Sequence, residues 1–279
     1  MTKGVLLFAQ NNSQIDYIKQ AQFCAKRIKE YLNLPVCLAT DTLEYLDEHY
    51  KDYHKYFDEV VELERQPVLH RKKFRDGLYS EKTLEWRNLN RADAWDVTPF
   101  NETIVMDTDL IVSNSILLQA FNSNQDFLIA KESKDIKTTR YTYEFKRISD
   151  RSIDMYWATL FYFKKNDSTR MLFDLIKHIR DNWNFYRLTY KIVEKKFRND
   201  FAFSIAIHIL NGFRKTNWPL PMPGNLWHTL DKDILVDLKA DKLTFLLEKD
   251  WEYQAASVQG LNVHVMNKFS LNRIIDEQL

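Results

Sequence analysis

Two carboxylates, Asp107 and Asp109, stand between two short apolar runs at residues 103–106 and 110–112. The apolar runs predict buried strands, at whose ends a charged group is costly unless an opposite charge offsets it. A hard divalent cation that carries a diphosphate would supply that charge, because carboxylate oxygens are ligands that such cations prefer. Side chains two residues apart on a strand point the same way, so both carboxylates are predicted to face one cation. The same pattern also occurs in ordinary turns and helix caps, and the flanking strands are what favour a metal site.

The elements ahead of this pair alternate between strand and helix, which predicts a parallel α/β sheet. The predicted strands are residues 5–9, 36–39 and 59–63, and the predicted helices are residues 15–32 and 43–49. Ligands bind beyond the carboxyl ends of such strands, where the polar residues 10–13, 40–41 and 107–109 follow. Three polar strand ends on one edge indicate a nucleotide site, although the chain has no glycine-rich phosphate loop.

The remainder is predicted to complete the same domain. It has predicted strands at residues 127–130, 155–163 and 261–266 and predicted helices at residues 169–184 and 201–210. Asn199 or Asp200 is the expected N-cap of the last of these helices. Arg87 and Arg91, four residues apart ahead of the carboxylate pair, are predicted to share one face of a helix. No linker rich in glycine, serine or proline interrupts the chain, so a single domain over residues 1–279 is predicted.

The composition narrows the class of protein. Lys and Arg total 40 against 39 Asp and Glu, a net charge of +1, so overall charge neither favours nor excludes a polyanionic partner. No run approaches the roughly 18 apolar residues of a membrane span, and the first apolar run is too short for a signal peptide. These features predict a cytoplasmic protein. Cys24 and Cys37 are expected to be buried free thiols, although a disulfide between them stays open.

Residues 98–114, TPFNETIVMDTDLIVSN, resemble the D-x-D segment of nucleotide-sugar-dependent glycosyltransferases with the GT-A fold. Residues 4–12 and 36–41 are similar to the first two strands of that family, and residues 157–165 resemble its acceptor-side strand. The resemblance is strongest to phage-encoded glycosyltransferases. It implies a single GT-A-like, Rossmann-like α/β domain with a mostly parallel central sheet flanked by helices. Residues 1–114 would be the nucleotide-binding half, and residues 115–279 the acceptor-binding half with a C-terminal metal-ligand segment.

The resemblance also implies a metal site built from distant parts of the chain. Asp107, Asp109 and a C-terminal histidine, here His264, would bind Mn²⁺ or Mg²⁺, and imidazole with carboxylates suits manganese. Lys268 and the D-x-D residues Asp107 and Thr108 would contact the diphosphate of a nucleoside-diphosphate sugar, with a UDP-sugar favoured. The glycine that the family usually has between this histidine and lysine is absent, and a single histidine is more often structural than a ligand.

The nucleotide contacts follow from the same resemblance. Ala9, Gln10 and Asn12 stand where the first strand of the family ends beside base and ribose, and Asp41 stands where its second strand meets the base. Arg87 and Arg91 match a position that often holds a cation near the nucleotide, although a solvated helical face explains Arg87 equally well.

Two acidic residues are candidates for the catalytic group on the acceptor side. Asp200 precedes a buried helix, as an acidic residue of the family does, and Asp154 precedes the aromatic strand. If the sugar is transferred with inversion, such a carboxylate would be the general base, whereas with retention it would orient the sugar. Helix capping explains Asp200 equally well.

Three basic and aromatic clusters, at residues 70–75, 137–147 and 190–198, suggest an acceptor. Cations bind phosphates and aromatic rings can stack on unpaired bases, which favours hydroxymethylated cytosine in double-stranded phage DNA. A saccharide, glycolipid or protein acceptor stays open, and so does a non-catalytic module that binds a nucleotide sugar or nucleic acid. Residues 65–79 could form a lid over the donor.

Overall fold

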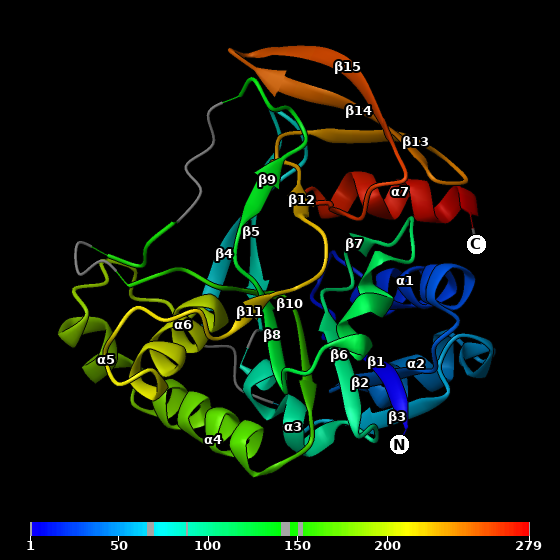
Figure 1. Cartoon of the computed structure of the whole chain (residues 1–279). Coiled ribbons are helices and arrows are strands. Elements are labelled where there is room, and N and C mark those ends of the chain that lie inside the picture. Colours follow the sequence, from blue (N-terminus) through cyan, green and yellow to red (C-terminus); the bar gives the residue numbers. More distant parts are fainter. Residues whose placement is uncertain (1, 66–69, 88, 141–145, 150–152, 279) are drawn as a thin grey trace.

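The computed structural model describes residues 2–65, 70–87, 89–140, 146–149 and 153–278. Its centre is a seven-stranded sheet in the order β11–β8–β10–β6–β1–β2–β3 (Figure 1). The strands are Lys3–Ala9 (β1), Val36–Thr40 (β2), Glu59–Glu62 (β3), Glu102–Met106 (β6), Phe127–Ala130 (β8), Trp157–Lys164 (β10) and Leu220–Pro221 (β11). Six of them share one direction, and β10 runs against its neighbours β6 and β8. The predicted α/β class with a mostly parallel central sheet is confirmed.

Helices cover both faces of this sheet. They are Tyr17–Leu32 (α1), Leu43–His49 (α2), Ala94–Val97 (α3), Asp167–Asp181 (α4), Trp183–Thr189 (α5), Asn199–Leu210 (α6) and Lys268–Gln278 (α7), with 3-10 turns at Tyr53–Lys55, Asn90–Asp93 and Ile116–Asn122. Successive side chains of a strand point to opposite faces, so Val5 and Leu7 pack on the α1 side while Leu6 packs on the α4 and α6 side. A hydrophobic core on each face of the sheet therefore holds the strands in place.

Several predicted boundaries are wrong for local reasons. The predicted helix at 169–184 is two helices, since α4 ends at Asp181 and Asn182 separates it from α5. Helix α6 begins at Asn199 with Arg198 as its N-cap residue, so neither Asn199 nor Asp200 caps it. Arg87 follows a strand and Arg91 lies in a 3-10 turn, so the two arginines do not share a helix.

Three smaller sheets complete the part of the chain that the structure describes. The first is a hairpin of His70–Arg75 (β4) and Glu81–Trp86 (β5). The second contains Leu110–Ile111 (β7), Val263–His264 (β16), Leu226–His228 (β12) and Ser133–Asp135 (β9). The third contains Ile234–Lys239 (β13), Lys242–Lys249 (β14) and Glu252–Gln259 (β15). Figure 1 shows the last sheet at the top of the molecule, beside α7. The hairpin tip is attached to this part, because Leu78 N–H donates to the Tyr253 hydroxyl (2.9 Å) and Arg273 pairs with Asp76 (2.7 Å).

Cys24 and Cys37 are buried free thiols, as expected, so no disulfide joins them. Within the described residues, no helix combines the length and the apolar character needed to cross a membrane.

Candidate metal and nucleotide site

Asp107 and Asp109 lie in a turn between β6 and β7. The backbone N–H of Asp107 donates to the carbonyl of Thr159 on β10 (3.0 Å), and the N–H of Leu110 donates to the carbonyl of Asp107 (3.1 Å). The prediction that both residues lie on an extended strand is therefore wrong. The turn still directs both carboxylates to one place, because its two ends are fixed to neighbouring strands.

Strand pairing brings His264 to this turn from the far end of the chain. His264 on β16 is paired with Leu110 on β7, and Val265 N–H donates to the carbonyl of Asp109 (2.9 Å). The Nε2 atom of His264 lies 3.0 Å from Oδ2 of Asp109 and 3.7 Å from Oδ2 of Asp107. One ligand atom from each of the three residues lies within 4.8 Å of the others. The three predicted metal ligands thus form one cluster.

Two cations contact the same carboxylates. Lys268, at the start of α7, forms an ion pair with Asp109, and Arg91 forms one with Asp107 while donating to the carbonyl of Ala158 (2.9 Å). Burial raises the pKa of Asp107, but nearby positive charge, above all that of the Arg91 guanidinium, outweighs it and holds that pKa below the usual value. The carboxylate is therefore ionised at neutral pH.

The cluster has the chemistry that a divalent cation needs. Burial lowers the pKa of His264, which favours the neutral imidazole that binds metals. Burial and the charge of Lys72 lower the pKa of Lys268 to about 7. One buried carboxylate, one half-buried carboxylate and a neutral imidazole fit a borderline-hard ion such as Mn²⁺. Asp107, Asp109 and His264 would hold it, and the two cations would then be available to anionic oxygens.

The cluster borders a cavity of about 750 Å³. Many predicted site residues line it: Gln10, Asn12, Arg87, Arg91, Asp107, Thr108, Asp109, Asp200, His264 and Lys268. A second cavity of about 780 Å³ shares Asn11, Asn12, Glu85 and Arg87 with the first and includes Asp41. The carboxyl ends of β1, β2 and β6 therefore meet around connected space. Ala9 and Asp154 line neither cavity.

Asp41 is a buried carboxylate at the end of β2. Its Oδ2 atom lies 4.0 Å from Nε of Arg87, and neither carboxylate oxygen has a hydrogen-bond partner among the described residues. Burial raises its pKa, although Arg87 opposes the change. Arg87 is itself held by the carbonyl of Asn11 (3.0 Å). A ligand that donates an N–H group would satisfy this carboxylate.

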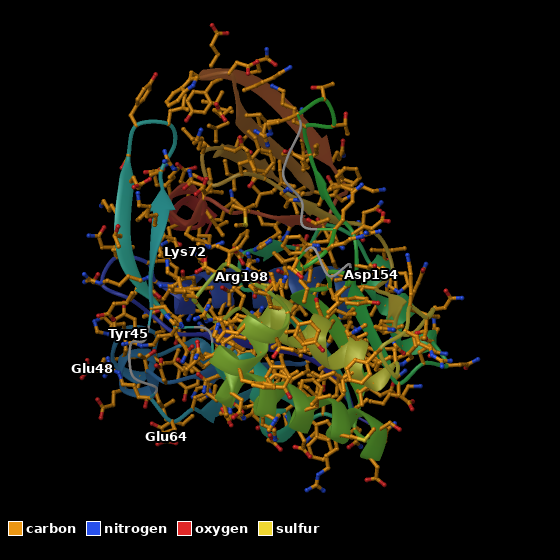
Figure 2. All side chains as sticks on the ribbon, turned by 90° about the vertical axis from the view of Figure 1, so that its left-hand side faces the viewer. Tyr45, Glu48, Glu64, Lys72, Asp154 and Arg198 are labelled. Carbon is orange, nitrogen blue, oxygen red and sulfur yellow. The ribbon has the colours of Figure 1, made fainter. Side chains whose placement is uncertain are left out.

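Of the two predicted catalytic carboxylates, the cavity contains only Asp200. Its Oδ1 atom accepts the N–H of Ala158 on β10 (2.9 Å), and Oδ2 accepts from Nη2 of Arg198 (2.6 Å). Asp154 instead pairs with Lys131 (2.8 Å) and lies well apart from Lys72 and Arg198 in Figure 2.

Among the other residues that line the cavity, Lys72, His228 and Asp231 carry titratable groups that sequence reasoning did not assign to the site. Lys72 on β4 lies 5.3 Å from the ring centroid of Trp86, and burial lowers its pKa. The basic cluster at 70–75 contained this lysine, and two-residue spacing could have placed Lys72 and Phe74 on one side of a strand. His228 contacts Oγ of Ser133 (2.7 Å), and burial lowers its pKa to about 4. No sequence signal identifies His228 or Asp231.

No protein-family model and no curated protein matches the chain. Among solved structures, it is similar to the glycosyltransferase GlyE of Streptococcus pneumoniae TIGR4, with a TM-score of 0.41 and 12% identity over 75% of this chain and 43% of that one. The apo form of GlyE gives a TM-score of 0.39 at 12% identity, with 77% and 45% covered. The bifunctional IspDF of Campylobacter jejuni gives 0.36 at 11% identity, with 74% and 47% covered. The chain spans less than half the length of these proteins.

Proposed function

We propose that the protein is a metal-dependent glycosyltransferase, which moves a sugar from a nucleoside-diphosphate sugar to an acceptor hydroxyl. The observation that carries the proposal is the Asp107, Asp109 and His264 cluster, whose ligand atoms lie within 4.8 Å of one another beside a cavity of about 750 Å³. It lies beyond the carboxyl ends of parallel strands, where ligands bind in sheets of this kind.

The residues around the cluster support binding of a diphosphate. Asp107, Asp109 and His264 would hold Mn²⁺ or Mg²⁺, which supplies positive charge for the leaving diphosphate. Arg91 and Lys268 touch the same two carboxylates and would bind the non-bridging phosphate oxygens once the ion neutralises the aspartates. Charge on the leaving group is then stabilised by groups that are already in place.

The donor we favour is a UDP-sugar. Asp41 has no hydrogen-bond partner among the described residues, and its carboxylate can accept the N–H of a pyrimidine base. Gln10, Asn12 and Arg87 line the space between Asp41 and the metal cluster, where the ribose would lie.

Asp200 is our choice for the group that acts on the acceptor. The Arg198 guanidinium and the Ala158 N–H hold its carboxylate at the cavity wall. In an inverting reaction it would take the proton of the attacking hydroxyl, and in a retaining one it would orient the sugar. We assign no such part to Asp154, whose partner Lys131 lies outside the cavity lining.

The nature of the acceptor is a question separate from the metal and the donor. Modified cytosine in phage DNA remains a prediction, as do saccharide, glycolipid and protein acceptors. Lys72, Lys196 and Arg198, from two of the predicted clusters, line the cavity. In the cluster at 137–147, Arg140 forms ion pairs with Asp135 and Asp233. Residues 141–145 of this cluster and residues 66–69 of the predicted lid lie outside the described residues. Mass spectrometry of nucleosides after co-expression with a hydroxymethylcytosine pathway tests the DNA acceptor, which an unchanged profile would exclude.

Donor hydrolysis tests the proposal as a whole. The protein is incubated with Mn²⁺ and a panel of UDP-sugars, and release of UDP is measured for the wild type and for Asp109→Asn. We expect release from at least one donor and none from the variant. No release together with no binding of any nucleotide would refute the proposal, whereas nucleotide binding without release would favour the non-catalytic module.

A further inference from the structure

Four large apolar side chains are exposed on and near α5. Phe185 is 64% exposed and Leu188 is 59% exposed, both on α5, while Val193 in the following segment is 93% exposed and Phe213 after α6 is 66% exposed. Single exposed apolar residues are common on soluble proteins, but a contiguous group marks an interaction site.

The four residues come from adjoining segments of the chain. Phe185 and Leu188 are three residues apart on α5 and so share a face of the helix. Ring contacts join the segment after α5 to the end of α6, because Tyr190 and His208 lie 6.2 Å apart and His208 and Phe213 lie 5.5 Å apart by ring centroids. In Figure 1, α5 lies at the left edge of the molecule beside α6. We call Phe185, Leu188, Val193 and Phe213 the docking surface.

This part of the chain is strongly basic. Residues 183–218 contain seven Lys and Arg and two Asp and Glu, a net charge of +5 in a chain whose total is +1. Lys191, Lys195, Arg214 and Lys215 are all exposed. Net positive charge therefore accompanies these four exposed apolar residues along the chain.

We propose that this surface docks on an anionic lipid membrane. The apolar side chains would enter the boundary between headgroups and acyl chains, and the lysines and arginines around them would contact lipid phosphates. The chemistry fits lipid better than nucleic acid. Half of the docking surface, Leu188 and Val193, is aliphatic and cannot stack on bases, and Val193 is the most exposed of the four residues at 93%.

Docking would also place the cavity close to the bilayer. Glu194, Lys196 and Arg198 line the cavity, and they directly follow Val193 in the chain. A hydroxyl carried by a lipid could then enter from the membrane side. Only this consequence rests on the proposed glycosyl transfer; the docking itself does not.

Vesicle flotation with the full chain tests the docking. Phosphatidylcholine vesicles are compared with vesicles that also contain about 30% phosphatidylglycerol, at low and high salt. We expect the protein to float with the anionic vesicles and to be released as salt rises. Lys191→Gln with Lys195→Gln should weaken partitioning about 25-fold, since each lysine near the surface contributes about fivefold. Val193→Ser should weaken binding at every salt concentration.

The matched control is Lys239→Gln with Lys242→Gln. These two exposed lysines flank the β13–β14 turn, far from α5 in Figure 1, and the double variant should float like the wild type. All substituted residues are exposed, so thermal unfolding should show that each variant folds. Equal losses in both double variants would overturn the proposal, as would no flotation of the wild type. Binding to an oligonucleotide but not to vesicles would assign the surface to nucleic acid instead.

Discussion

Replacing Arg91 with alanine tests whether the arginine and a metal ion compete for Asp107. The Arg91 side chain pairs with Asp107 and donates to the carbonyl of Ala158 (2.9 Å), with 16% of its area exposed. Removing one partner of a buried ion pair costs about 3–5 kcal/mol, and the partial exposure of both partners places this pair near 3. At about 2–4 °C per kcal/mol, Tm should fall by about 6–12 °C.

Mn²⁺ should reverse most of this loss. A ligand present at about 100 times its Kd stabilises the folded state by about 2.7 kcal/mol, close to the cost of the substitution. In the wild type the ion must displace Arg91 from Asp107, whereas in Arg91→Ala this competitor is gone and only Lys268, on Asp109, remains. The increase in Tm on adding Mn²⁺ should therefore be larger in the variant than in the wild type. Differential scanning fluorimetry with and without Mn²⁺ measures this difference.

Arg180→Ala provides a closely matched control. Arg180 also pairs with an aspartate, Asp93 (2.9 Å), and also donates to a backbone carbonyl, that of Leu89 (3.2 Å), with 19% of its area exposed. It lies outside the residues that line the cavity. Its loss should destabilise the protein by a similar amount, and Mn²⁺ should shift its Tm only as in the wild type. Equal Mn²⁺ shifts in the two variants would refute the reasoning.

Three further predictions concern the rest of the structure. Asp200→Asn should lower turnover of the donor and acceptor by about 10²–10⁴-fold with little change in UDP affinity, measured by steady-state kinetics and calorimetry; unchanged turnover would remove Asp200 from the mechanism. Burial raises the pKa of Cys24 and Cys37 to about 12, so at pH 9 native thiols should react with iodoacetamide at least about 10³-fold more slowly than in urea. The pKa values of these thiols are higher in the folded than in the unfolded protein, so the thiols' contribution to the free energy of unfolding is complete below about pH 8.5 and is lost as pH rises towards 12. Unfolding curves at alkaline pH should show this loss. Arg140→Met should lower the free energy of unfolding by about 3–5 kcal/mol in urea titrations, because Arg140 bridges two buried aspartates at 2.7 Å; a loss below 1 kcal/mol would contradict this.

The parts of the fold that the sequence predicted well are those with local patterns. The continuous apolar runs of β1, β2 and β6 and the helical periodicity of α1 are visible in short windows, since these elements are buried along a whole length or one face. The position of Asp107 and Asp109 between two buried strands followed from the same apolar flanks. The turn that they form did not, because backbone hydrogen bonds to β10 decide it.

Elements that depend on distant packing were missed or misread. Strand β4 has the sequence HRKKFR, which looks like a solvated cation cluster, yet it pairs with β5 and turns Lys72 towards the cavity. Its burial comes from other parts of the chain, so a short window cannot show it. Sheet β13–β14–β15 was overlooked although Leu243, Phe245 and Leu247 alternate inward, which is a period-two signal. The meeting of His264 with Asp109 depends on the pairing of β16 with β7 and has no local signature.

The central claim is that Asp107, Asp109 and His264 hold one divalent cation together with a nucleoside diphosphate. Calorimetric titration of Mn²⁺ into the protein, with and without UDP, tests it directly. We expect one Mn²⁺ per chain, bound more tightly when UDP is present, and no such binding to Asp109→Asn. Absence of Mn²⁺ binding to the wild type under both conditions, or equal binding to the variant, would contradict the claim.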